Sequence, residues 1–321
     1  MSDTFDRIAS RLKIRHLSLL LAIQRHGSLS RVADELGVSQ PAATKALAEV
    51  EAIFGAKLFT RSRHGMQPTE LGGLALTRAR HMLEDVRKWA DEADALRDGR
   101  GTHLSVGAVP FVSGDLLTQA IQALHDRHGV SVTLHRAGTD QLMEILARRE
   151  LDCVIGRASV VGLGQGVQYE MLYPQVPVMV AHPALASRIN RSQPDWGELA
   201  DMKWILPSRA TPTGIMVSEL FVRAQVQPPQ PIVETYSMEV LEGMLGDSDN
   251  ILSIVPEEIA LQLCAKGRVA IVPWTFDREL PAISLIRQAR EVPSQPEEQF
   301  ATILRELCVT LNLHRDGRDA S

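Results

Sequence analysis

The 321-residue sequence predicts an α/β protein that carries an all-α head at its N-terminus. Apolar residues recur at helical spacing over residues 12–97, whereas short apolar strands alternate with helices from residue 103 onward. A glycine-containing break, Asp98-Gly99-Arg100-Gly101, separates the two patterns and marks the best domain boundary. The hydrophobic content of 45% suits a globular chain of two or three domains with real cores.

The head is predicted to contain a helix-turn-helix followed by a wing. Its expected elements are helices over 12–26, 28–36 and 39–54, and short strands over 58–61 and 66–68. Gly37 ends the second helix and Ser39 caps the third, so two short helices meet at a tight turn. Leu36 and Val38 are expected to face the core. The two strands flank a basic turn, Ser62-Arg63-His64-Gly65, which predicts a winged arrangement.

The third helix begins with short polar side chains in place of an apolar stripe. Donors and acceptors on Gln40, Thr44 and Lys45 suit base edges in a major groove, and Ala42 and Ala43 would allow a close approach. A capped surface helix explains this segment equally well by itself, but the turn, the wing and the long following helix favour DNA recognition. The residues predicted to contact DNA are Arg31, Ser39, Gln40, Pro41, Ala42, Thr44, Lys45, Arg61 and Arg63.

A long helix capped by Thr69 is predicted to extend to about Leu96. Its apolar stripe is longer than a small head can cover, so packing against a second chain is favoured over a long helix within one domain. The expected domains are therefore residues 1–68 for the winged helix-turn-helix, 69–97 for the dimerisation helix and 102–313 for the α/β part, with a tail over 314–321.

The α/β part is predicted to form two units, and the chain is expected to cross from one unit to the other twice, near 172–176 and 275–282. One unit is expected to comprise 102–173 with 283–313, and the other 174–280. Strands are predicted over 103–110, 130–136, 151–157, 177–181, 203–206, 232–235, 251–255, 269–272 and 283–287. Helices are predicted over 114–128, 139–149, 213–225, 237–245, 256–264 and 295–312.

Ligands of open α/β sheets bind outside the carboxyl ends of the strands, and several such ends should meet at the cleft between the two units. Ser113 caps a helix whose free N–H groups could seat an anion, Arg157 could clamp a carboxylate, and Phe111 could form an aromatic wall. The predicted effector-binding residues are Pro110, Phe111, Val112, Ser113, Thr139, Arg157, Ser208, Arg209, Thr211 and Ser237. For each Ser or Thr plain helix capping is the simpler explanation, and for Arg157 a surface ion pair is equally reasonable.

Charge and cysteine content limit the class of protein. Residues 1–70 contain ten Lys and Arg against seven Asp and Glu, while the whole chain has a formal charge of −5, so a basic head precedes an acidic body. The three cysteines are far apart and odd in number, which predicts neither disulfides nor a metal cluster and favours a cytoplasmic location. The N-terminus lacks a signal-peptide pattern and no apolar run is long enough to span a bilayer.

Short motifs that resemble catalytic ones lack the context that catalysis needs. Ser10-Arg11-Leu12-Lys13 fits an S-x-x-K pattern without its companion motifs. The run Gly162-Leu163-Gly164-Gln165-Gly166 leads into a strand-like segment, so it lacks the setting of a phosphate loop. His125 and His128 lie one helical turn apart with no third ligand evident. We therefore expect no enzyme, no metal and no cofactor.

Residues 28–72 resemble the DNA-binding head of LysR-type transcriptional regulators. The positions that carry the resemblance, in the spacing of the family, are Ala33, Leu36, Ser39-Gln40-Pro41-Ala42, Glu51, Gly55, Leu58-Phe59, Arg61, Thr69 and Gly72. The resemblance implies a winged helix-turn-helix, a linker-helix dimer, tetramers built from two dimers, and an effector domain like periplasmic binding proteins. Residues 247–256, "DSDNILSIVP", depart from the glycine-rich run that most relatives show, so ligand contacts there are not transferred.

The sequence thus predicts a homodimeric or homotetrameric regulator that binds an interrupted inverted repeat in double-stranded DNA. A small carboxylate, either aromatic or dicarboxylic, is the expected effector in the interdomain cleft, where it would change the placement of the heads. The alternatives are a small-molecule-binding protein of the solute-binding type, which leaves the head unexplained, and a metabolic α/β enzyme, for which no acid–base or nucleophile set assembles.

Overall fold

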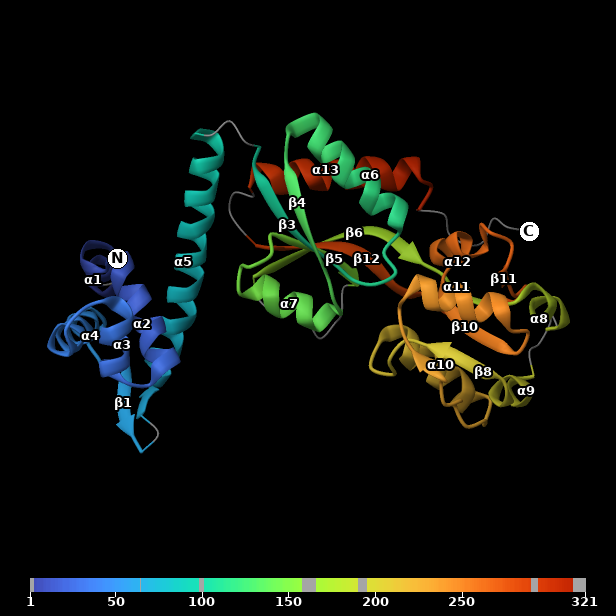
Figure 1. Cartoon of the computed structure of the whole chain (residues 1–321), viewed down its shortest axis with the longest axis horizontal. Coiled ribbons are helices and arrows are strands. Elements are labelled where there is room, and N and C mark those ends of the chain that lie inside the picture. The colour runs from blue at the N-terminus through green and yellow to red at the C-terminus, as the bar shows by residue number, and fades with distance from the viewer. Residues whose placement is uncertain are drawn as a thin grey trace. The chain divides into compact units, whose positions relative to one another are not determined.

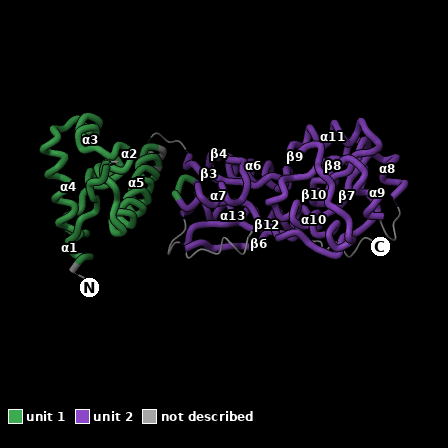
Figure 2. The backbone as a smooth tube through the Cα atoms, turned by 90° about the horizontal axis from the view of Figure 1, so that it is seen from below, with its two compact units in different colours: residues 1–100, 148–150 green, residues 101–147, 151–321 purple. Residues whose placement is uncertain are grey.

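The computed structural model describes residues 3–63, 65–97, 101–157, 166–189, 195–289 and 294–313. The chain forms two compact units, one of residues 1–100 with 148–150 and the other of residues 101–147 with 151–321 (Figure 2). Among the described helices, none is both long and apolar enough to cross a membrane. Residues 98–100 of the predicted break, 162–165 of the glycine-rich run and the tail over 314–321 lie outside the described residues.

The first unit is a helical head with a two-stranded wing and a long last helix (Figure 1). Its elements are α1 (Asp3–Arg11), α2 (Ile14–His26), α3 (Leu29–Leu36), α4 (Gln40–Phe54), β1 (Phe59–Ser62), β2 (Gly65–Pro68) and α5 (Glu70–Arg97). The strands of the wing are antiparallel, with Thr60 opposite Gln67. The predicted winged helix-turn-helix is therefore confirmed, and α1, which the apolar spacing did not indicate, packs against α4.

Four helices close the core of the head. Leu20 and Ile23 of α2, Val32 of α3 and Val50 of α4 are at most 1% exposed, and one face of α5 joins them. Leu36 and Val38 were expected in this core but are 38% and 45% exposed. Both residues flank the Gly37 turn beyond the last buried residue of α3, where they line a hollow of about 460 Å³ beside α4.

The second unit begins with a mixed five-stranded sheet in the order β4-β3-β5-β12-β6. The strands are β3 (His103–Ala108), β4 (Ser131–Arg136), β5 (Cys153–Arg157), β6 (Val167–Gln175) and β12 (Leu280–Gln288). Helices α6 (Gly114–His128) and α13 (Gln295–Thr310) cover one face, and α7 (Thr139–Ala147) covers the other (Figure 1). Strands β3, β4 and β5 are parallel, as βαβ connections require, whereas β12 is antiparallel to both of its neighbours.

A second five-stranded sheet has the order β11-β7-β10-β8-β9. Its strands are β7 (Pro177–Ala181), β8 (Lys203–Leu206), β9 (Val233–Glu234), β10 (Ile251–Pro256) and β11 (Ala270–Ile271). Its helices are α8 (Pro183–Arg188), α9 (Trp196–Asp201), α10 (Pro212–Arg223), α11 (Met238–Asp247) and α12 (Glu257–Cys264). Residues of α10 pack into one apolar cluster and those of α11 and α12 into another, so the sheet is covered on both faces.

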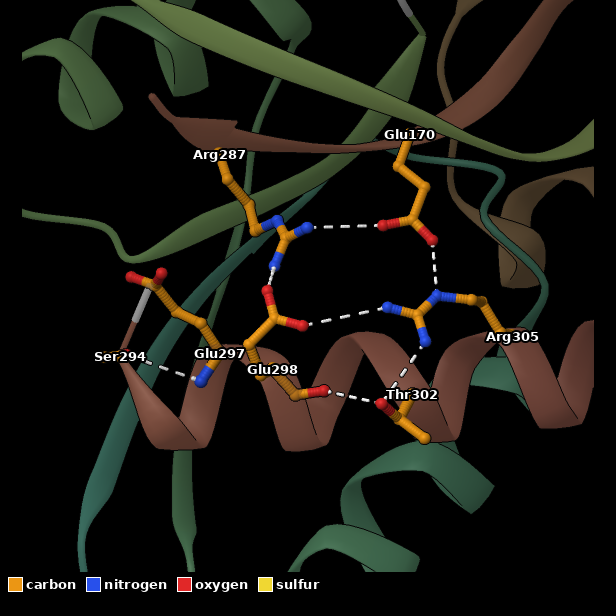
Figure 3. A network of polar contacts seen from close by, with 7 residues as sticks. All are labelled: Glu170, Arg287, Ser294, Glu297, Glu298, Thr302 and Arg305. Atoms are coloured by element: carbon orange, nitrogen blue, oxygen red, sulfur yellow. Dashed lines mark hydrogen bonds and ion pairs between the residues drawn. The ribbon is translucent and has the colours of Figure 1, made fainter. Parts of the chain in front are cut away.

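The chain passes between the two sheets twice, from β6 into β7 and from β11 into β12. The strand order therefore places the last helix, α13, back on the first sheet. A four-membered ion network holds it there (Figure 3): Glu170 of β6 and Glu298 of α13 each form ion pairs with both Arg287 of β12 and Arg305 of α13, at 2.5–3.8 Å. Because Arg287 is only 11% exposed, this network is worth more than an isolated surface pair.

Candidate DNA interface and effector pocket

The first turn of α4 presents the predicted reading residues to solvent. Ser39 is the N-cap, and its Oγ accepts from the N–H of Ala42 at 3.4 Å. Gln40 and Lys45 are exposed, and Thr44 is exposed while its hydroxyl donates to the Gln40 carbonyl at 2.9 Å. A capped helix start with exposed amide, hydroxyl and ammonium groups can enter a major groove and pair with base edges.

The other predicted DNA contacts are also on the surface of the head. Pro41 and Ala42 are exposed beside the reading residues, Arg31 is exposed on α3, and Arg61 and Arg63 are exposed in and next to β1. Ala43 differs from expectation: it is 1% exposed and faces the core, so Ala42 alone supplies the small surface residue of this turn. The turn residue His64 lies outside the described residues.

In the second unit, a pocket of about 350 Å³ opens between the two sheets. Its lining residues are Pro110, Phe111, Val112, Gly114, Arg136, Tyr236, Met238, Ile259 and Gln262. The first five lie in the β3-to-α6 segment and at the end of β4, whereas the last four lie at α11 and α12 on the other sheet. The volume and the mostly apolar lining with few polar groups are those of a small-molecule site.

Phe111, which lines this pocket, has an unusual backbone conformation. Its φ of +64° lies in the left-handed region, which a bulky side chain rarely adopts. The ring packs edge-on against Tyr236 with centroids 5.2 Å apart, and it is 4% exposed within the apolar cluster of α11 and α12. Phe111 therefore follows β3 of the first sheet in the sequence, but its ring packs in the apolar cluster of the second sheet.

Arg136 is the charged residue of the pocket, and it is not among the effector-binding residues predicted from the sequence. It ends β4, and its Nη1 donates to the Val109 carbonyl at 3.3 Å, which orients the side chain. Arg136 is exposed, and its partial burial lowers its pKa from the ordinary value, although a guanidinium with so high a starting pKa stays charged near neutrality. Its signal in the sequence was an arginine at the carboxyl end of a strand, the same signal that selected Arg157.

Three of the predicted effector residues, Pro110, Phe111 and Val112, line this pocket. Among the others, the hydroxyl oxygens of Ser113, Thr211 and Ser237 accept from helical N–H groups at 3.2–3.3 Å and act as N-caps. The backbone carbonyl of Ser208 accepts from the Thr211 hydroxyl, Arg209 donates to the Pro229 carbonyl, and Thr139 begins α7. These six, together with Arg157, are not among the residues that line the pocket, and helix capping accounts for three of them.

Arg157 is buried and is not among the residues that line the pocket, so it is not an open clamp. It is 6% exposed, and its Nε and Nη2 both donate to Gln175 Oε1, at 3.0 and 2.7 Å. Gln175 in turn donates through Nε2 to the Phe111 carbonyl, at 3.0 Å, and to Glu258 of α12. Residues of both sheets are thus joined in one polar chain, which the sequence could not indicate because its members are far apart.

Glu258 is the acidic end of this chain. Burial raises its pKa to about 7, against the opposing effects of the hydrogen bond from Gln175, its own backbone N–H and the Arg157 charge. Neighbouring Tyr173 has a raised pKa for the same reason, since it is buried beside Glu258. The junction between the sheets therefore contains a carboxyl group that titrates near neutrality.

Comparison with known proteins agrees with both units. The chain matches the family model described as LysR substrate binding domain over residues 97–309, and the model described as bacterial regulatory helix-turn-helix protein, lysR family, over residues 14–73. The HTH-type transcriptional regulator PcaQ of Agrobacterium fabrum is 29% identical over 304 residues, covering 93% of this chain and 96% of that protein. GbpR of Azospirillum brasilense is 28% identical over 271 residues, covering 83% and 78%.

Solved structures have the same fold over nearly the full length. CbnR, described as a LysR family transcriptional regulator, superposes with a TM-score of 0.55 at 21% identity, covering 92% of this chain and 99% of that one. Full-length LysG from Corynebacterium glutamicum, with bound effector arginine, gives 0.64 at 17% identity, covering 93% and 99%. The two matched family models cover the head and most of the second unit, so the chain belongs to the LysR family of transcriptional regulators, with a DNA-binding head and an effector-binding domain.

Proposed function

We propose that this regulator reads DNA with the first turn of α4 and holds the flanking phosphates with its wing. The observation that carries the proposal is the exposure of Gln40, Thr44 and Lys45 on a capped helix start. Short side chains surround them, so the helix can approach base edges closely. Arg61 and Arg63, exposed at the wing, are positioned on a separate element and suit backbone contacts that carry no sequence information.

The long helix α5 supports a two-fold arrangement of heads. Ala75, Leu76 and Ala79 pack into the core of the head, but Leu74, Met82 and Trp89 remain 56%, 46% and 71% exposed. These three are seven or eight residues apart, about two helical turns, and so fall on one face. Covering this face with a second α5 would pair two reading helices, as an inverted repeat requires.

For the effector we propose a small carboxylate held against Arg136. The pocket offers one guanidinium on a wall of apolar and aromatic groups that includes Phe111 and Tyr236. A carboxylate can accept two parallel hydrogen bonds from a guanidinium, and a planar or short apolar body fits the remaining surface. The effector would contact both sheets at once, so its binding would favour one angle between them.

Sequence-specific binding is tested by selecting duplexes from a random pool with the full-length protein, alongside a gel shift on the DNA upstream of its own gene. We expect enrichment of an interrupted inverted repeat whose half-sites follow the spacing of two heads. Recovery of unrelated sequences with equal affinity would contradict the DNA-reading assignment.

The effector class is tested by thermal-shift screening of aromatic and dicarboxylic acids on the full-length protein. A carboxylate should raise the melting temperature in proportion to the logarithm of its concentration, and its amide should not. Stabilisation by neutral analogues as strong as that by the acids would contradict the carboxylate assignment.

A further inference from the structure

Glu51 of α4 is a buried carboxylate that the reading turn does not use. From the sequence it is one of the positions that carry the family resemblance, and in the structure it is only 6% exposed. Its Oε1 accepts from the backbone N–H groups of Leu58 and Phe59, at 3.0 and 3.4 Å, and its Oε2 lies 2.6 Å from Lys57 Nζ. The carboxylate therefore bridges the end of the recognition helix to the first residues of the wing.

A charged acceptor is well suited to this position. Leu58 and Phe59 are 0% and 4% exposed, so their N–H groups have little access to water and need a partner within the protein. Bonds to an ionised acceptor are shorter and stronger than neutral ones, and here two of them converge on one oxygen. Glu51 thereby fixes the backbone that leads into β1.

The same segment is also attached to α5. The Leu58 carbonyl accepts from Thr69 N–H at 2.9 Å and from Thr69 Oγ1 at 3.3 Å. Gly72 of α5 lies so close that a Cβ there would be 1.9 Å from the Leu58 oxygen. Leu58 is therefore held from one side by the recognition helix and from the other by the helix that we assign to dimerisation.

The second strand of the wing has its own anchor at Gly27, the C-cap of α2. The N–H of Met66 donates to the Gly27 carbonyl at 2.8 Å. Between this anchor and Leu58 the chain carries the two exposed wing arginines, Arg61 and Arg63. The wing is a two-stranded ribbon, so two fixed points define its direction. Glu51 of the recognition helix holds one of these points, at Leu58 and Phe59.

We propose that Glu51 is a positioning residue for DNA binding: its carboxylate holds the wing, and with it Arg61 and Arg63, at a set distance from the reading turn of the same helix. This rests on the proposed function of the reading turn and the wing. Loss of the carboxylate should free the wing from its phosphates while base reading by Gln40 continues, because the reading residues lie at the opposite end of α4.

The test is Glu51→Gln in the full-length protein, with Glu49→Gln as the matched control. Both variants remove one negative charge from α4, but Glu49 is 48% exposed and its ion pairs with Lys13 and His16 are both as long as 4.0 Å. In Glu51→Gln the new amide N–H₂ would face the Lys57 ammonium, donor against donor. Binding is measured by fluorescence anisotropy at several salt concentrations, on a duplex selected from a random pool by the wild type and on a scrambled duplex.

For Glu51→Gln we expect about tenfold weaker binding to both duplexes and a salt slope smaller by about 1 to 2, as expected when one or two phosphate contacts are lost. The ratio between selected and scrambled duplex should stay within about threefold of wild type. Glu49→Gln should bind equally or more tightly at an unchanged slope. Glu51→Asp, which keeps the charge but shortens the reach, should behave like Glu51→Gln.

A merely structural role for Glu51 would reduce the active fraction or the melting temperature without altering the salt slope of the molecules that bind. Equal slopes for Glu51→Gln and Glu49→Gln would therefore overturn the inference. Failure of the wild type to prefer any sequence would instead contradict the proposed reading turn, so the two outcomes are distinguishable.

Discussion

At the scale of single residues, Gln40 is the side chain whose loss should separate specificity from affinity. Its amide can pair with adenine through two hydrogen bonds, worth about 1–3 kcal/mol of discrimination. We expect Gln40→Ala to reduce the ratio between selected and scrambled DNA by roughly tenfold while the salt slope stays constant. Gln122→Ala, on the exposed surface of α6, is the control. An unchanged ratio in Gln40→Ala would show that Gln40 does not read the base sequence.

Arg136 allows a second residue-scale prediction, now for the effector. A charge-assisted hydrogen bond to a carboxylate contributes about 1.5–3 kcal/mol, so Arg136→Ala should weaken a carboxylate found by thermal shift by roughly tenfold to a hundredfold in calorimetry. Arg223→Ala, exposed in the last turn of α10, should leave the affinity unchanged. Wild-type affinity in Arg136→Ala would exclude the guanidinium from the site.

The contrast between Arg136 and Arg157 shows how far single residues can be predicted from the sequence. Both end a strand, and the sequence analysis selected only Arg157 as a carboxylate clamp. Its guanidinium is buried against Gln175, which is 18 residues away in the chain, whereas Arg136 lines the pocket. Periodicity and strand ends predict the position of a residue within its strand or helix. Its contact partners depend on the fold of the whole chain.

At the scale of elements, strong local signals were the reliable ones. Helices α6 and α4 begin at predicted caps, Ser113 and Ser39, and end at αL glycines, so their bounds agree with expectation within a residue. Two six-residue helices, α8 and α9, were not predicted, because a single turn and a half carries too little periodicity to distinguish from a loop. The buried environment of Glu51 was likewise invisible, since it depends on a turn that reverses the chain.

The exposed face of α5 supports an element-scale prediction on assembly. Met82→Glu would place a carboxylate in the middle of the face formed with Leu74 and Trp89, and burying unpaired charge costs about 3 kcal/mol or more. We expect the dissociation constant of the dimer to rise more than about a hundredfold, measured by sedimentation equilibrium. Thr77→Glu, exposed on another side of α5, should still dimerise, and a dimeric Met82→Glu would exclude this face from the interface.

At the scale of the whole effector-binding unit, the two sheets are joined by more than their two crossings. The ring of Phe111 enters the apolar cluster of the second sheet, and the chain from Arg157 through Gln175 to Glu258 spans the same junction. Gln175 ends β6, two residues before β7 begins, so this chain of hydrogen bonds lies at one of the two connections between the sheets. The groups that face Glu258 are Arg157, Tyr173, Gln175 and its exposed neighbour Glu257.

This junction should make the stability of the unit depend on pH through Glu258. Its pKa is raised to about 7 in the folded unit from an ordinary 4.5, so the folded unit keeps a proton that the unfolded chain releases. The stability that this group contributes is therefore fully present below about pH 4.5 and falls as pH rises toward 7. Above pH 7 it stays level, and the total loss of unfolding free energy is at most about 3 kcal/mol. The same sign favours a closed junction at lower pH, because an opened and hydrated Glu258 would release its proton more readily.

The measurement is urea unfolding of the full-length protein from pH 5.5 to 8, followed by tryptophan fluorescence, since Trp196, Trp204 and Trp274 all pack in one apolar cluster on the second sheet. Glu258→Gln removes the titrating group but keeps its size, so it should flatten the decline with pH. Glu257→Gln, the exposed neighbour on α12, should retain the wild-type decline. If Glu258→Gln and the wild type lost the same stability as pH rises, another group would be the one that binds the proton. Closure of the junction would then not depend on Glu258.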